Sequence, residues 1–190
     1  MLWFTSDLHL HHENILGYTE RHKFFADTDE MGRCLIENIN SCVSPDDTLW
    51  ILGDVCMGRG KDESCRKLLD MLVCKDVHLV LGNHDMKDKD LLLAAGFVEV
   101  CDYRKIGLGS KHAQACLMHY PMLTWDRRNS GSYMLHGHIH ATPSYNEGNR
   151  ENGLRRYDVG VDANGYMPVS AEQIVSFFDG MEIAQDAGGW

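Results

Sequence analysis

The feature that most constrains the fold of this chain is a series of short polar clusters, each placed directly after an apolar run. The runs are rich in Val, Ile, Leu, Met or Trp, which indicates buried strands that end where the clusters begin. The chain therefore predicts several strands that deliver oxygen and nitrogen ligands to one rim. The clusters are, in order, Asp7-Leu8-His9, Gly53-Asp54, Gly82-Asn83-His84-Asp85, His119 and Gly137-His138-Ile139-His140.

The side chains in these clusters favour a pair of metal ions. Carboxylate, carboxamide and imidazole ligands together suit Mn, Fe, Zn or Ni, whereas Ca binds oxygen ligands only. Asp7 and His9 are two residues apart, so on an extended backbone they project to the same side, and His138 and His140 share that spacing. Each motif alone is a weak signal, because ordinary strand ends and turns also contain Asp and Gly.

The cluster at 82–85 adds a possible proton-transfer group. Asn83 offers a neutral oxygen ligand, while His84 beside it stays free to move a proton. We expect Asp85 to orient the His84 imidazole. An ordinary loop of Asn and Asp after a strand is the alternative interpretation.

Length and charge predict one domain and limit its partners. The chain has 190 residues, 44% of them hydrophobic, which supplies one sizeable core. We expect a single domain over 1–180 and a C-terminal tail over 181–190. The formal net charge of -10 argues against broad electrostatic capture of nucleic acid, although two bound cations would offset part of it locally.

The cysteines and the first residues favour a reducing compartment. The seven cysteines are scattered, odd in number and without a C-x-x-C pair, which predicts reduced, mostly buried thiols. The chain does not start with a basic segment followed by an apolar stretch, and no run approaches membrane-spanning length. We therefore expect a cytoplasmic protein with no membrane partner.

Strand and helix patterns alternate through the first half of the chain, which predicts the α/β fold class. We expect strands over 2–5, 48–52, 77–81, 133–135 and 155–161, the last after a Gly/Asn-rich loop. We expect helices over 28–43, 65–73 and 89–95, and a closing helix after 170. Thr28 is a candidate N-cap, Ser170 has capping-box spacing, and 186–190 should fray. Segments 98–106 and 112–118 predict a hairpin, so part of the sheet is antiparallel.

The full ordered set of motifs, D-x-H, G-D, G-N-H-D, a lone His and G-H-x-H, resembles the calcineurin-like metallophosphoesterase superfamily, in particular its small bacterial and phage members. The resemblance spans about residues 1–168, nearly the whole domain. It implies a mixed two-sheet β-sandwich flanked by helices, with the metals at the strand ends.

The resemblance also implies two ligand sets and a reaction. One ion is expected on Asp7, His9, Asp54 and His140, and the second on Asp54, Asn83, His119 and His138. A shared carboxylate makes physical sense because two dications about 3.5 to 4 Å apart repel strongly. The expected reaction is in-line attack on phosphorus by a metal-bridging hydroxide, while His84 protonates the departing alkoxide.

Candidates for substrate contact lie beside these motifs. The first motif continues as D-x-H-x-x-H-x-N, which resembles some small members of the superfamily, so His12 and Asn14 are candidates, and capping of the next helix is the alternative. Further groups for holding phosphate or stacking on a base are Arg59, Lys61, Trp125, Arg127 and Arg128. For each of these taken singly, surface charge or core packing is the alternative.

Three functional hypotheses follow. The first is a two-metal phosphoesterase, with Mn the ion expected in vitro, acting on small phosphomonoesters or phosphodiesters, nucleotides being one candidate class. A non-catalytic scaffold of the same fold is the second, although such scaffolds tend to lose the histidines and carboxylates that are intact here. The third is a nuclease acting on nucleic-acid ends, which the acidic balance disfavours.

Overall fold

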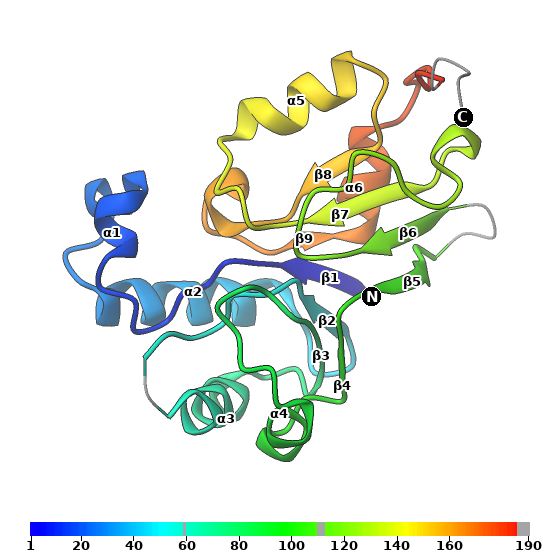
Figure 1. Ribbon diagram of the computed structural model, residues 1–190. Helices are drawn as coiled ribbons and strands as arrows, with labels where there is room; N and C mark the ends of the chain where they lie inside the picture. Colours follow the sequence, from blue (N-terminus) through cyan, green and yellow to red (C-terminus); the bar gives the residue numbers. More distant parts are fainter. Residues whose placement is uncertain (59, 110–112, 186–190) are drawn as a thin grey trace.

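The computed structural model describes residues 1–58, 60–109 and 113–185 and contains two β-sheets with helices around them (Figure 1). The strands are β1 Leu2–Thr5, β2 Thr48–Ile51, β3 Asp76–Val80, β4 Glu99–Cys101, β5 Arg104–Gly107, β6 Gln114–Leu117, β7 Tyr133–His136, β8 Arg156–Asp158 and β9 Val169–Ser170. The helices are α1 Ile15–Tyr18, α2 Thr28–Cys42, α3 Lys61–Met71, α4 Lys89–Ala95, α5 Pro143–Glu151 and α6 Ala171–Phe177, with 3₁₀ turns at Glu20–Lys23, Arg128–Ser130 and Val161–Asn164.

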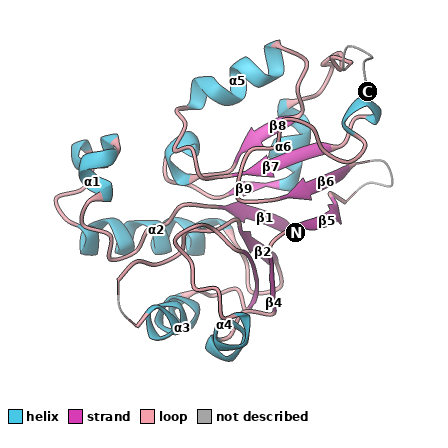
Figure 2. Ribbon diagram, viewed as in Figure 1, coloured by secondary structure: helices cyan, strands magenta, loops and turns pink. Residues whose placement is uncertain are grey.

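Both sheets are mixed, as expected for the two-sheet sandwich, and the fold class is confirmed. The first sheet has the order β4-β3-β2-β1-β9, in which β9 alone runs antiparallel to its neighbour. The second has the order β5-β6-β7-β8, in which β5 and β6 are antiparallel and the remaining pairs are parallel. Figure 2 shows the strands in the middle, with α3 and α4 outside one sheet and α5 outside the other.

Alternation along the strands explains the two layers of the core. In β1, Trp3 packs on the helix side of the first sheet, and Phe4 points between the two sheets. In β2, Leu49 repeats the first direction and Trp50 the second, because successive side chains of a strand point to opposite faces. Both faces of this sheet are covered, which is why its strands are continuous apolar runs.

The predicted hairpin is partly wrong. The segment 98–106 is not one strand, because β4 pairs in parallel with β3 in the first sheet, whereas β5 starts the second sheet and pairs with β6. The chain thus changes sheets between Cys101 and Arg104. The turn residues 110–112 lie outside the described residues.

The helices differ from the sequence prediction in three places. The N-cap of α2 is Asp27, whose carboxylate accepts from the Glu30 amide, and Thr28 is already helical. Helix α3 begins at Lys61, four residues before the predicted start. The Gly/Asn-rich loop before β8 contains α5, with Pro143 in its first turn.

Other predictions hold. Ser170 forms the capping box of α6 with Gln173, and Gly96 ends α4. All seven cysteines are free thiols, and four of them are buried. The residues predicted to fray, 186–190, lie outside the described part of the chain, and the boundary at 180 stays a prediction. None of the helices among the described residues combines the length and apolar character needed to cross a membrane.

The topology sets the position of the site. Strands β1, β2 and β3 are parallel, so their carboxyl ends reach the same edge of the first sheet, and β6 and β7 are parallel in the second. A bridge between Ser6 and Gly160 joins the end of β1 to the chain that leaves β8. The loops that follow these strands therefore meet at one edge of the sandwich.

Candidate metal centre

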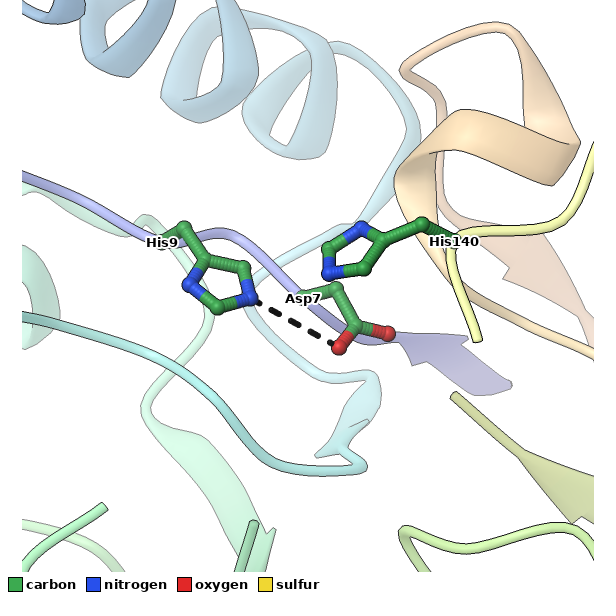
Figure 3. A group of neighbouring side chains, drawn as sticks. All are labelled: Asp7, His9 and His140. Atoms are coloured by element: carbon green, nitrogen blue, oxygen red, sulfur yellow. Dashed lines mark ion pairs between the residues drawn. The ribbon is translucent and has the colours of Figure 1, made fainter. Parts of the chain in front are cut away.

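Two groups of potential metal ligands lie at this edge. Asp7, His9 and His140 form one group, in which the ligand atoms lie within 4.8 Å of one another. Figure 3 shows the two imidazole rings and the carboxylate turned toward a common space. Asp54, His119 and His138 form the second group by the same measure.

The Asp54 carboxylate lies between the two groups. Its Oδ2 atom is 3.5 Å from Nε2 of His9 in the first group and 3.4 Å from Nε2 of His119 in the second. Asn83 joins the second group, because its Oδ1 lies 2.9 Å from that same His119 nitrogen. The fold thus brings all seven expected ligands together from five separate loops.

The backbone that presents these ligands is not extended, contrary to the reasoning from D-x-H and H-x-H spacing. Five ligands have left-handed backbone conformations, which non-glycine residues adopt rarely and at a cost of free energy. They are Asp7 (φ 60°), His9 (φ 50°), Asp54 (φ 56°), His138 (φ 74°) and His140 (φ 46°). The side chains of each pair converge because the chain turns at each ligand.

Two glycines of the motifs let the loops approach each other. A Cβ atom at Gly82 would overlap the Asp54 carboxylate, and a Cβ atom at Gly137 would overlap Ser6 and Asp7. The overlap involves packed groups, so no rotamer change relieves it. These glycines therefore set the distance between the carboxylates and the neighbouring loops.

Buried polar atoms without partners fit a bound cation. Asp7 Oδ1 and His9 Nε2 are buried and have no hydrogen-bond partner, a costly arrangement unless a ligand compensates it. Burial lowers the pKa of His9 to about 3, which keeps its nitrogen lone pair available. Burial opposes ionisation of Asp54, but the His119 hydrogen bond and nearby positive charge lower its pKa to about 2. The neutral His9 imidazole beside the ionised Asp54 carboxylate offers nitrogen and oxygen donors of the kind that divalent metals bind.

The second nitrogen of each ring fixes which nitrogen faces the centre. Nδ1 of His119 is 2.8 Å from the carbonyl of Leu52, and Nδ1 of His140 is 2.8 Å from Asp162 Oδ2. An Nδ1–H donated to an oxygen leaves Nε2 as the ligand atom. In His9, Nδ1 lies 3.1 Å from Nδ1 of His12, so Nε2 again turns toward the carboxylates.

Arg21 and Asp162 support the first group, and the sequence analysis missed both. Arg21 is fully buried and donates from Nε and Nη2 to Asp162 at 2.9 and 2.6 Å. It also donates from Nη2 to the carbonyl of Asp7 at 2.7 Å. Asp162 follows the apolar end of segment 155–161, as Asp7 and Asp54 follow their strands, and this position was the signal available in the sequence. Arg21 lies 141 residues before Asp162, and nothing in its local sequence indicates this pairing.

Asp85 does not orient His84, which corrects the sequence prediction. Both of its carboxylate oxygens accept backbone amides, Oδ2 from Asp54 and Gly82 and Oδ1 from Val55. The carboxylate thus binds backbone amides of the loops after β2 and β3. Asp85 therefore positions the backbone at Asp54 and acts on the centre through that residue.

His84, His12 and Asn14 line the same cavity as the two ligand groups. This cavity has a volume of about 410 Å³. The His84 ring lies 5.5 Å from the His9 ring and 5.9 Å from the His12 ring. Asn14 is at the N-cap position of α1, but its side chain makes no capping hydrogen bond, so the capping alternative is not supported.

The remaining candidates lie elsewhere. Trp125 is buried against Cys116 and Met134, so it is a core residue and cannot stack on a base. Arg127 donates to Gln114, at the opposite end of β6 from His119. Lys61 donates to the carbonyl of His84 and supports that loop.

One of the two other basic candidates packs on a core residue. Arg128 lies against the Trp125 ring, 5.6 Å from its centroid. Arg59 lies outside the described residues.

Comparison with known proteins agrees with this geometry. The chain is 30% identical to the Gene 66 protein of Mycobacterium phage L5, over 90% of this chain and 91% of that protein. It is 28% identical to an uncharacterized protein of Methanocaldococcus jannaschii, over 94% and 91% of the two chains. A crystal structure of a protein of unknown function from Aquifex aeolicus shares the fold, with a TM-score of 0.69 at 24% identity over 93% of this chain and 98% of that one. The family described as calcineurin-like phosphoesterase matches residues 1–159. The chain belongs to the calcineurin-like phosphoesterase family.

Proposed function

We propose that this protein is a two-metal phosphoesterase that hydrolyses small phosphomonoesters or phosphodiesters. The position of Asp54 carries the proposal. One oxygen of its carboxylate lies 3.5 Å from a ligand nitrogen of the first group and 3.4 Å from one of the second. A single negative oxygen facing both groups suits two neighbouring dications, whose repulsion needs charge between them.

The donor set assigns a role to each group of residues. Asp7, His9, Asp54 and His140 would hold one ion, and Asp54, Asn83, His119 and His138 the other. Bound there, two divalent cations would polarise the phosphoryl oxygens and supply a deprotonated water as nucleophile. Mn, Fe, Zn and Ni all fit the mixture of carboxylate, amide and imidazole ligands, with Mn our choice for assays.

His84 is our candidate for protonating the leaving group. It lines the cavity beside both ligand groups, and hydrogen bonds hold its backbone on both sides of its Cα atom. Its amide donates to Asp54 Oδ1 at 2.8 Å, and its carbonyl accepts from Lys61. The ring is thus carried on an anchored loop, which suits a group that delivers a proton to one oxygen. His12 and Asn14, which line the same cavity, are our candidates for binding the substrate.

The other features of the chain support this proposal more generally. Free thiols at all seven cysteines are consistent with the reducing environment that we propose, the cytoplasm. The net charge of -10 supports a small phosphorylated substrate over a nucleic-acid backbone.

The test is to remove the shared carboxylate without changing its shape. Asp54→Asn should leave the fold intact, lower the bound metal from two ions to one or none, and lower hydrolysis of p-nitrophenyl phosphate and bis(p-nitrophenyl) phosphate in Mn by at least about a thousandfold. Asp126→Asn is the matched control, because Asp126 is exposed and pairs only with Lys105 among the ion pairs of the described residues. Full activity in Asp54→Asn with two ions bound would refute the proposal.

A further inference from the structure

A second cavity continues from the metal centre on the side of His140. It has a volume of about 930 Å³ and shares Tyr18, Thr19 and His140 with the cavity that holds the two ligand groups. We call it the aromatic groove, after Tyr18, Phe24 and Tyr166 in its lining. Because the two cavities share walls, a molecule with its phosphorus at the metal centre can extend past His140 into the groove.

The aromatic rings of the groove are accessible and held in place. Tyr18 is 76% exposed and Phe24 is 63% exposed, unusual values for such large apolar surfaces. The Tyr166 ring packs edge-on against Phe24 and Phe25, with centroids 5.4 and 4.9 Å apart. Exposed aromatic rings that line one concave surface are typical of a ligand-binding site.

The backbone of Tyr166 is also constrained. Its φ of 66° lies in the left-handed region, which a bulky residue rarely adopts. The conformation is fixed by two hydrogen bonds, from its amide to Val161 and from the Asn38 side chain to its carbonyl, at 2.8 and 2.9 Å. Strained residues that the surrounding structure holds firmly cluster at binding sites.

The charges of the groove favour a neutral ring over a second phosphate. Its two carboxylates are already paired, Glu20 with Lys23, and Asp162 with Arg21 and His140. Within the described residues, the lining includes neither lysine nor arginine to receive an anion. A planar uncharged group would stack on the exposed rings without disturbing these pairs.

Another cavity borders the metal centre at Asn83. This third cavity, of about 480 Å³, shares Asn83 with the central one and includes Tyr120, Lys87 and Lys89 in its lining. The central cavity thus borders one cavity at His140 and a separate one at Asn83. A monoester has one substituent on phosphorus and would leave one side empty, whereas a diester has two.

We propose that the substrate is a phosphodiester and that one of its ester groups carries a planar aromatic ring, such as a nucleobase, in the aromatic groove. This inference rests on the proposed phosphoesterase activity and narrows its substrate class. Tyr18 and Phe24 are the specificity-determining residues. Water adds to phosphorus as one ester P–O bond breaks, and the leaving oxygen takes a proton, so a phosphomonoester and an alcohol result.

The kinetic test compares two diesters with the same leaving group, bis(p-nitrophenyl) phosphate and methyl p-nitrophenyl phosphate. Their intrinsic reactivities differ, so the informative quantity is how each variant changes the ratio of their kcat/KM values. Tyr18→Ala and Phe24→Ala should each lower that ratio about five- to a hundredfold, the range for loss of one stacking contact. The control is Val98→Ala, which shortens a 54% exposed side chain near the start of β4, at the opposite end of the sheet.

Several results would overturn the proposal. If both variants left the ratio of the two kcat/KM values unchanged, the proposal that a ring binds in the groove would be refuted, and the phosphoesterase proposal would remain. A higher kcat/KM for p-nitrophenyl phosphate than for either diester would contradict the diester assignment. Melting temperatures equal to that of the wild type would show that Tyr18→Ala and Phe24→Ala fold normally.

A binding experiment separates the groove from the reaction. Phenylphosphonate and methylphosphonate cannot be hydrolysed at their P–C bonds and differ in the ring alone. In calorimetric titrations of the Mn-loaded protein, phenylphosphonate should bind at least about fivefold more tightly, and Phe24→Ala should abolish the difference. If no ester were hydrolysed but phenylphosphonate still bound more tightly, the ring-binding role of the groove would be supported and the phosphoesterase proposal refuted. No preference for phenylphosphonate in the wild type would refute the groove.

Discussion

Replacing Asp162 by asparagine should weaken both folding and metal binding, by separate routes. The Asp162 carboxylate accepts two hydrogen bonds from the buried Arg21 guanidinium and faces Nδ1 of His140. An asparagine of the same shape keeps one acceptor oxygen and loses the charge, so Arg21 becomes a buried cation without its counterion. Loss of one partner of a buried ion pair costs about 3 to 5 kcal/mol, and since Asp162 is 11% exposed we expect about 3.

Metal binding should fall because His140 loses the charged acceptor that fixes its ring. Removing a carboxylate that supports a metal-binding histidine lowers metal affinity about 10- to 100-fold. The two effects are measured on the same variant, the first by urea unfolding in chelator and the second by titration with Mn at neutral pH. With a typical slope of about 2 kcal/mol per M, the loss of stability lowers the urea midpoint by about 1.5 M.

A double variant distinguishes the two routes. Arg21→Met in the Asp162→Asn background removes the unpaired charge and should restore part of the stability, whereas His140 remains unsupported and the metal affinity should stay low. The restoration is partial, because Arg21 also donates to the carbonyls of Asp7 and Leu8. Unchanged stability and unchanged Mn affinity in Asp162→Asn would refute the reasoning, as would recovery of metal affinity in the double variant.

Two further predictions concern histidines near the centre. His84→Ala should lower turnover of an alkyl phosphate ester at least about tenfold more than turnover of a p-nitrophenyl ester, because the poor leaving group needs the proton; equal losses with both metals retained would remove His84 as the acid. Burial lowers the pKa of His136 to about 4, so between pH 6.5 and 4 the unfolded chain binds a proton that the folded chain excludes, and stability is lost as the pH falls through that window. The loss of stability amounts to roughly 3 kcal/mol, at 1.36 kcal/mol per unit of pKa. In urea unfolding of the metal-free protein, His136→Gln should not show this loss between pH 7 and pH 4. A His136→Gln variant that loses as much stability as the wild type would contradict the assignment.

The candidate ligands could be predicted from the sequence because each lies directly after a strand. An apolar run followed by Asp7 or Asp54 specifies both the strand and the residue at its carboxyl end, and parallel pairing brings those ends together. The backbone at these residues was not accessible in the same way. The left-handed turns at Asp7 and His9 depend on hydrogen bonds from their amides to the loop after β2, 45 or more residues away.

Two of the errors share a physical cause, since each depended on a partner outside the segment itself. Helix α5 was read as a loop because its sequence is rich in Asn and Gly, yet Asn146 is buried and exchanges two hydrogen bonds with the backbone of Asp158 in β8. Trp125 was read as a possible stacking residue, but the packing of Cys116 and Met134 covers it. Local composition cannot report such contacts, because tertiary packing overrides propensity.

The carboxylates at the centre also explain how the strained loops are held. Asp7 accepts the His138 amide on Oδ2 and leaves Oδ1 without a partner, facing the first ligand group. Asp54 accepts the His84 amide on Oδ1 and turns Oδ2 toward both groups. Each carboxylate therefore ties its own loop to a loop from another strand with one oxygen and offers the other oxygen to a cation. Because the same side chain does both, a bound ion that orders either carboxylate also fixes the distance between the loops. We therefore expect metal binding to be coupled to the backbone geometry at His138 and His84 through these two side chains.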